Sequence, residues 1–255
     1  MTNLEINNDL FAPPFCEKVE TFIAPIPSSR LETGKSFKIA GGWQYFNQLK
    51  VIQINNDSYV EVAMTPSKLL SSSKTHSKNS LKRAEMNLDN ILKKRLPYSK
   101  LDMSEPHIMG VINITRDSFY KNSQKNDYSS VKKTFEKMER FGASIIDLGG
   151  ESTRPGSKMI SASEEQCRVI QIIQSLKEKN YKSLISLDTR NFSTMKKGYR
   201  KGVDSINDIT GFNDKNKIDF VSKNKTPIVV MHMQRDPENM QKNPQYNFAP
   251  IDIYK

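Results

Sequence analysis

The sequence has little cysteine and no long apolar run. Cys16 and Cys167 are the two cysteines among 255 residues, too few for a disulfide framework or a cysteine-based metal cluster. No apolar run reaches the length of a membrane-spanning helix. The acidic N-terminus, MTNLEINNDLF, has its first arginine at Arg30, unlike a signal or transit peptide. We therefore expect a cytoplasmic protein with reduced thiols and no membrane partner.

Hydrophobic residues are also scarce, at 36% of the chain, so part of it is expected to be loop or disordered. The length allows one large α/β domain, or a domain of about 150 residues with an extension. The formal net charge of +11 would attract anions in general. The excess is mostly lysine, however, and it is spread over the whole chain without a basic stripe. We therefore expect a solvated basic surface and no nucleic-acid partner.

Residues 1–70 are expected to form an N-terminal extension of unknown role, either α+β or partly disordered. Three segments have the pattern of short strands: residues 21–24, 50–54 and 58–64. Prolines such as Pro25 and Pro27 are expected to interrupt any longer element. No group of catalytic residues stands out in this region.

Residues 71–104 are expected to be a polar linker followed by a lead-in helix. The run SSSKTHSKNS over 71–80 contains no apolar residue and cannot build a core. Residues 81–96 carry leucine, isoleucine and methionine at helical spacing, which indicates an amphipathic helix. Such a helix would close the bottom of a barrel or simply lead into it.

From residue 105 onward, short apolar runs alternate with amphipathic helical segments. The predicted strands are residues 107–114, 144–148, 183–187, 202–206 and 226–230. Polar residues follow each strand, among them Asn113, Asp188 and Asn207. This order favours right-handed βαβ units in a parallel sheet, and a (β/α)₈ barrel of the TIM type explains the polar strand ends better than an open sheet.

The stretch GASIIDLGGESTRPGS, from Gly142 to Ser157, combines the features expected of a site. A buried strand runs into a glycine pair that permits a sharp turn. A polar loop follows, with a permanent cation at Arg154 and a stiffening proline at Pro155. Parallel α/β folds place their sites on such loops at the C-terminal end of the sheet.

Five motifs together resemble dihydropteroate synthase, the pterin-binding family of folate biosynthesis and the target of sulfonamides. They are IMGVINITRDSF, GASIIDLGGESTRPGS, ISLDTR, SINDITG and PIVVMHMQRDPENMQKNPQY. They occur in the order and spacing of the family over roughly residues 105–246. The resemblance implies a partial barrel over residues 105–255, with about five of the eight β/α units present.

The resemblance implies an enzyme that condenses 6-hydroxymethyl-7,8-dihydropterin pyrophosphate with p-aminobenzoate, giving 7,8-dihydropteroate and pyrophosphate. Loss of pyrophosphate calls for Mg²⁺ or other cations on the leaving group. The implied partners are these two small molecules and, because family members are commonly dimers, a second copy of the chain.

The resemblance also implies the site residues. The predicted catalytic residues are Asp188 and Asn207, the metal ligand is Asn113, and the further substrate-binding residues are Thr153, Arg154, Pro155 and Met231. The chemistry of the side chains agrees, since an aspartate can accept hydrogen bonds from a pterin and stabilise developing positive charge. An asparagine both donates and accepts.

Structural roles remain open for these residues. Asp188 could cap the helix that follows it, and Asn113 and Asn207 could be turn residues at strand ends. Met231 is about equally suited to a core role, since methionine packs against pterins and apolar side chains alike. The first loop departs from the family, with Arg116 in the place of a proline and Asp117 followed by SFYKNS instead of SFSDGG.

Three interpretations follow from the partial barrel. The chain could be part of a functional synthase, a catalytically inactive remnant, or a non-catalytic pterin-binding or scaffold module that uses its N-terminal region. We rank the synthase first, because five motifs in register indicate that lineage.

Overall fold

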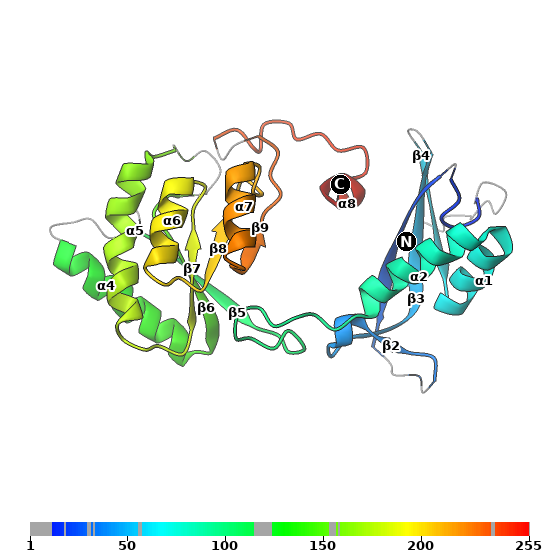
Figure 1. The fold of residues 1–255 in the computed structure, drawn as a ribbon, viewed down its shortest axis with the longest axis horizontal. Coiled ribbons are helices and arrows are strands. Elements are labelled where there is room, and N and C mark those ends of the chain that lie inside the picture. The colour runs from blue at the N-terminus through cyan, green and yellow to red at the C-terminus, as the bar shows by residue number, and fades with distance from the viewer. Residues whose placement is uncertain are drawn as a thin grey trace. The chain divides into compact units, whose positions relative to one another are not determined.

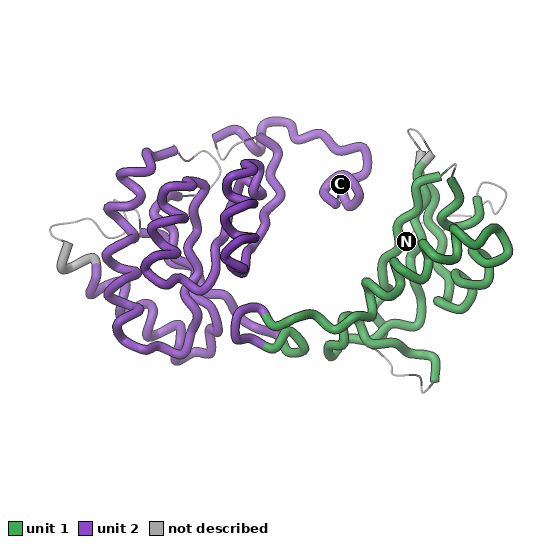
Figure 2. The backbone as a smooth tube through the Cα atoms, viewed as in Figure 1, with its two compact units in different colours: residues 1–97, 102–105 green, residues 98–101, 106–255 purple. Residues whose placement is uncertain are grey.

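The chain forms two compact units (Figure 2). The computed structural model describes residues 12–17, 19–29, 32, 34–55, 58–114, 124–152, 157, 159–235 and 238–254. Unit 1 comprises residues 1–97 and 102–105, and unit 2 comprises residues 98–101 and 106–255. Each unit has an apolar cluster of its own. In the part of the chain that the structure describes, no helix has both the length and the hydropathy needed to cross a membrane.

Unit 1 contains an antiparallel sheet. Its strands are β1 (Glu20–Ser28), β2 (Phe37–Lys38), β3 (Tyr45–Asn55) and β4 (Ser58–Met64), with a 3₁₀ turn, η2 (Ile39–Gly41), after β2. The long β3 pairs with the other three strands. The predicted strands are confirmed. The prediction that Pro25 and Pro27 interrupt a longer element is wrong, because β1 is an edge strand that tolerates a missing N–H, with a register shift before Pro27.

Two helices, α1 (Pro66–His76) and α2 (Lys78–Leu92), replace the polar linker predicted over residues 71–80, so that prediction is wrong. Thr65 and Ser77 cap the two helices, and their hydroxyls accept backbone N–H groups at 3.2 and 3.0 Å. Ser73 of α1 is fully buried although it is polar. Ser80 is buried, and its hydroxyl donates to the Phe15 carbonyl oxygen at 3.2 Å.

The predicted lead-in helix is confirmed as α2, but its place differs from the expectation. Ala84 and Leu88 of α2 are buried with Phe46 and Leu49 of β3, in the apolar cluster of unit 1. The helix therefore completes the apolar core of the N-terminal unit. Tertiary packing decided this, because the amphipathic pattern identifies a buried face without identifying its partner.

Unit 2 is a parallel sheet with helical connections (Figure 1). Its strands are β5 (Ile108–Asn113), β6 (Ala143–Gly149), β7 (Leu184–Asp188), β8 (Ser205–Asp208) and β9 (Ile228–Val230), and they lie side by side in sequence order. The connecting helices are α4 (Gln124–Arg140), α5 (Ala162–Lys177), α6 (Phe192–Arg200) and α7 (Lys215–Lys223); a short α8 (Ala249–Tyr254) follows. The five predicted strands and the helices between them are confirmed.

One face of this sheet packs on the helices. Ile112, Ile146, Leu148, Leu187 and Ile206 alternate along their strands and lie in one cluster with apolar residues of α4, α5, α6 and α7. A sheet whose strands keep sequence order, with the four connecting helices on the same face, is part of a (β/α)₈ barrel and not a doubly wound sheet. Among the described residues β5 and β9 each pair with one neighbour, so this sheet is open.

The predicted start of α5 is confirmed in detail. Ser161 is the N-cap, and its hydroxyl accepts the N–H of Glu164 at 3.2 Å. Close packing of α5 on β6 requires glycine at position 150, because a Cβ there would lie 2.9 Å from Cγ1 of Val169. The glycine pair predicted as a sharp turn therefore also brings this helix against the strand end.

Candidate active site

The C-terminal ends of β5 to β8 carry one row of residues in register. Asn113 pairs with Gly149, Gly149 with Asp188, and Asp188 with Asn207. Since side chains alternate along a strand, these positions share the face opposite to the helices, called the inner face below. The fold thus brings three predicted site residues together from three separate strands.

Gly149 has no side chain, and the small space that this leaves in the middle of the row is called the hollow below. A Cβ atom at this position would lie 3.2 Å from Oδ1 of Asn113 and 3.3 Å from Oδ2 of Asp188. Both contacts are tighter than ordinary van der Waals distances, so a larger residue would displace one of the two side chains. The glycine keeps an amide oxygen and a carboxylate oxygen facing the same small space.

Asp188 is the most strongly perturbed acid of the site. Its side chain is buried, and burial, together with the charges of Asp147, Glu165 and Glu151, raises its pKa to about 8. A carboxyl group with this pKa holds a proton at neutral pH until a cation or a strong hydrogen-bond donor binds beside it. Pairs of acids with unequal surroundings are typical of active sites.

Asp147 is a site residue that the sequence analysis missed. It lies two residues before Gly149 on β6, so it also faces inward. The Nδ2 of Asn207 donates to Oδ2 of Asp147 at 2.9 Å, which fixes the orientation of the Asn207 amide. Burial raises the pKa of Asp147, while Ser186 and Asn207 oppose the rise. Side chains alternate in direction along a strand, so counting back two residues from Gly149 would have identified Asp147 from the sequence.

The turn after Asp188 is held by a buried glutamate of α5. Oε2 of Glu165 accepts from Oγ1 of Thr189 at 2.9 Å and from Nδ2 of Asn191 at 3.1 Å. Asn191 is the N-cap of α6, so the alternative that Asp188 caps this helix does not hold. Burial raises the pKa of Glu165, whose hydrogen bonds oppose that rise.

An ion pair that the sequence analysis also missed holds the two ends of the loop after β6. Arg190 donates to both carboxylate oxygens of Glu151, at 2.8 and 3.1 Å, and to the carbonyl oxygen of Ile160 at 3.1 Å. Glu151 in turn accepts the N–H of Ile160 at 2.6 Å. Residues 151 and 160 are therefore tied together by a bidentate ion pair. No local sequence pattern predicts this pairing, because its partners lie 39 positions apart.

The remaining predicted residues are less defined. Thr153, Arg154 and Pro155 lie outside the described residues, as do Arg116 and Asp117 of the first loop. Met231 follows β9 directly, at the same edge of the sheet, and is 36% exposed. Its side chain is therefore not a core residue of unit 2.

The donor set near Gly149 suits one kind of metal site. Within the described ranges, no three His, Cys, Asp or Glu side chains form a metal-binding group. Asn113 offers an amide oxygen that faces the hollow next to Asp188. Mg²⁺ is commonly held by one or two protein oxygens together with substrate phosphates. These residues fit an ion shared with a pyrophosphate and do not fit an all-protein cage.

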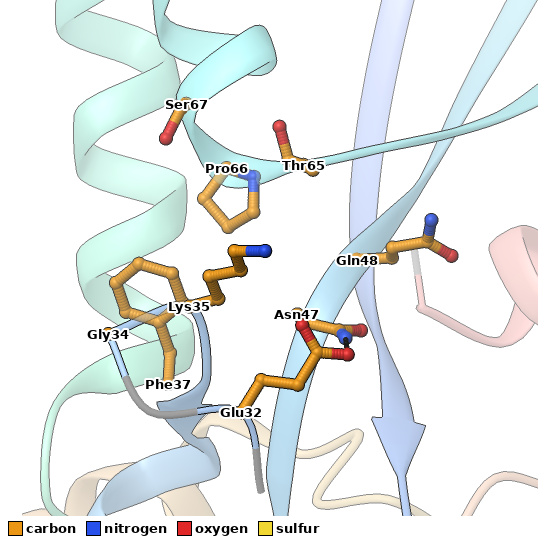
Figure 3. Close-up of a pocket in the computed structure, with 9 residues that line it drawn as sticks. All are labelled: Glu32, Gly34, Lys35, Phe37, Asn47, Gln48, Thr65, Pro66 and Ser67. Carbon is orange, nitrogen blue, oxygen red and sulfur yellow. Dashed lines mark hydrogen bonds between the residues drawn. The ribbon is translucent and has the colours of Figure 1, made fainter. Parts of the chain in front are cut away.

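A cavity of about 410 Å³ lies in unit 1 (Figure 3). It is lined by Glu32, Gly34, Lys35, Phe37, Asn47, Gln48, Thr65, Pro66 and Ser67. The Nδ2 of Asn47 donates to Oε1 of Glu32 at 3.2 Å, and this pair is exposed. The charged residues of its lining, Glu32 and Lys35, are exposed, so the inner face of unit 2, with its buried acids, is the better candidate for catalysis.

Comparisons with known proteins identify the family of this chain. The family described as pterin binding enzyme matches residues 109–251. The dihydropteroate synthase of Escherichia coli (strain K12) is 35% identical over 158 residues, which cover 61% of this chain and 56% of that protein. The chain thus spans about half the length of the curated relatives it matches.

Solved structures show the same relationship. The Yersinia pestis dihydropteroate synthase with a sulfonamide drug complex has a TM-score of 0.53 at 34% identity, over 60% of this chain and 56% of that chain. The Clostridium difficile enzyme in the presence of pteroic acid also has a TM-score of 0.53, at 32% identity, over 63% and 58% of the two chains. The predicted resemblance is confirmed by sequence and by structure.

Proposed function

Because this chain belongs to the pterin binding enzyme family, we propose that it acts in dihydropteroate synthesis. It would condense 6-hydroxymethyl-7,8-dihydropterin pyrophosphate with p-aminobenzoate to 7,8-dihydropteroate and pyrophosphate. The observation that carries this proposal is the row of Asn113, Asp188 and Asn207 around the hollow at Gly149. An amide, a protonatable acid and a second amide at one strand edge suit a flat ligand rich in donors and acceptors.

The reaction places positive charge where the acids lie. The amine nitrogen of p-aminobenzoate bonds to the pterin methylene carbon, the bond from that carbon to the pyrophosphate oxygen breaks, and the amine gives up a proton. Charge develops on the methylene as pyrophosphate leaves. The carboxyl groups of Asp147 and Asp188 would stabilise this charge in a buried setting, where electrostatic interactions are strong.

The pterin ring is assigned to Asp188 and Asn207. Asp147 occupies one N–H of the Asn207 amide, so the amide oxygen and the other N–H remain to read one acceptor and one donor on the ring edge. Hydrogen bonds from the ring would lower the raised pKa of Asp188, so binding at neutral pH would release a proton. Met231 is assigned to packing against the ring.

Asn113 is the proposed ligand of Mg²⁺, which would neutralise the leaving pyrophosphate. Thr153, Arg154 and Pro155 are assigned to p-aminobenzoate, with Arg154 as the fixed cation for an anionic group. Dimerisation is proposed from the resemblance, and the mass of the purified chain in solution tests it.

The experiment that tests the function is pyrophosphate release by purified 1–255 with both substrates and Mg²⁺. We expect release that requires both substrates, falls with a sulfonamide, is abolished by Asp188→Asn and is unchanged by Asp219→Asn on the exposed side of α7. Calorimetric binding of the pterin substrate without turnover would support a non-catalytic pterin-binding module instead. A folded chain with neither binding nor release would be an inactive remnant, and the proposal would fail.

A further inference from the structure

A second polar row lies directly below the first on the inner face. Asp147 pairs with Ser186, and Ser186 with Ser205, across β6, β7 and β8. All three side chains are buried. The interiors of such barrels are mostly filled by branched apolar residues. Two small hydroxyls beside a carboxyl group leave room in this layer for a side chain from elsewhere.

Tyr98 supplies a side chain to this layer. The segment 98–101 belongs to unit 2 and is closed by two backbone hydrogen bonds of 3.0 Å between Tyr98 and Leu101. The phenol hydroxyl is buried and lies beside Ser205. Burial raises the pKa of Tyr98, Ser205 opposes the rise, and the charge of Asp147 adds to it. The phenol is therefore within electrostatic reach of the carboxylate that holds Asn207.

Four buried oxygens meet in this region. Tyr98 Oη, Ser205 Oγ, Ser186 Oγ and Asp147 Oδ1 reach hydrogen-bond geometry with no atom of the described residues. Ser186 nevertheless lies near enough to Asp147 to stabilise its charged form. A buried polar atom without a partner is destabilising. Small rotations of three hydroxyls, or a bridging water, would join them into a chain that ends on the carboxylate.

We propose that Tyr98 is a positioning residue of the pterin site. It closes the inner face from below and, through Ser205 and Ser186, holds the Asp147 carboxylate that orients Asn207. The ligand in this inference rests on the proposed function. The position of Tyr98 comes from the structure and does not depend on the proposed function. Residue 98 also lies before the segment 109–251 that matches the family.

The first test is calorimetric titration of the full chain with 6-hydroxymethyl-7,8-dihydropterin pyrophosphate. Tyr98→Phe removes only the hydroxyl, and we expect affinity to fall about 5- to 10-fold, the effect of one lost hydrogen bond. Tyr181→Phe is the matched control, because its hydroxyl donates to Glu136 at 2.8 Å away from the inner face. Unchanged affinity in Tyr98→Phe, in a wild type that binds, would overturn the proposal.

Ser205→Ala keeps the phenol hydroxyl of Tyr98 and interrupts the same row of hydroxyl groups. It therefore replaces Tyr98→Phe if that variant fails to fold. We expect each variant alone to weaken binding and the double variant to lose no more than the larger single loss, because both interrupt one network. Fully additive losses of affinity would mean that the two hydroxyls act through independent contacts, and would contradict a single hydrogen-bond network.

A ligand-free measurement separates this inference from the proposed function. The ¹³C signal of the Asp147 carboxyl, assigned by its loss in Asp147→Asn, is followed as a function of pH; Asp188 on β7 and Tyr98 are the titratable neighbours. We expect Tyr98→Phe and Ser205→Ala to raise the pKa of Asp147, and Tyr181→Phe to leave it unchanged. If the pKa moves while wild type binds no pterin, the proposed function fails and the positioning role stands. If it does not move, the positioning role fails.

Discussion

The two faces of the parallel sheet in unit 2 have opposite characters, one apolar and packed and the other polar. In β5, Ile112 on the helix side is 3% exposed, whereas its neighbour Val111 on the inner side is 54% exposed. In β7, Leu187 packs on the helices while Asp188 faces the hollow at Gly149. The same strands therefore supply apolar area for folding on one face and acids for chemistry on the other. Burying those acids lowers stability, and the packed face offsets the cost.

Leu187→Ala should have the largest effect. Leu187 is fully buried in the cluster with the helices. Deleting its side chain leaves a cavity, and we expect the free energy of unfolding to fall by about 3–4 kcal/mol. Urea denaturation followed by far-UV circular dichroism measures it. A loss below about 1 kcal/mol would show that the helix face is not the principal source of stability.

Asp188→Asn should have the next largest effect, and it tests the inner face. The folded-state pKa of about 8 lies above the ordinary carboxyl value near 4, so between these pH values the folded state keeps a proton that the unfolded state has lost. The contribution of Asp188 to stability is therefore largest below about pH 4 and falls as pH rises toward 8. We expect the thermal midpoint of wild type to be several degrees higher at pH 5 than at pH 8.

Asp188→Asn should remove most of this pH dependence of stability, because an amide does not titrate. It should also weaken pterin binding by roughly 10- to 100-fold, the range for hydrogen bonds to a charged group. Differential scanning calorimetry at pH 5 and pH 8, with Asp219→Asn as the control, measures the change in the pH dependence. An unaltered slope in Asp188→Asn would assign the pH dependence to another acid.

Glu151→Gln should have the third largest effect, because it breaks the bidentate pair with Arg190 that ties residues 151 and 160 together. We expect about 2 kcal/mol of lost stability, since the guanidinium is partly buried and keeps one bond to Ile160. Cleavage by trypsin between these residues should also become faster. Glu61→Gln, at the partly exposed pair with Lys50, is the control, with an expected loss below about 1 kcal/mol. Equal losses in both variants would contradict a special role for the pair.

Val111→Ala should have the smallest effect and sharpens the contrast with Leu187. Because Val111 is more than half exposed, we expect a loss of about 0.5 kcal/mol or less. Chemical denaturation under identical conditions compares the two variants directly. A cost approaching that of Leu187→Ala would show that other polypeptide covers the inner face of β5 in solution.

Much of unit 2 could be predicted because its signals are local. Short apolar runs with β-branched residues predicted all five strands, and Ser161 with the acids behind it predicted the start of α5. The polar strand ends predicted a shared edge, since parallel strands align their C-terminal ends. The linker prediction failed because low hydrophobicity over residues 71–80 does not prevent a helix there when the two helices pack through Leu69, Ala84 and Leu88, outside that run.

The sequence alone determined the strands, their polar ends and the family, because each depends on neighbouring residues and on motifs in a fixed order. Only the tertiary structure decided that Asp147 holds Asn207, that Arg190 ties Glu151 to Ile160, and that the Tyr98 hydroxyl lies beside Ser205. These contacts join residues far apart in the chain. The physical reason is that hydrogen bonds and burial depend on distance in space, which a one-dimensional pattern does not contain.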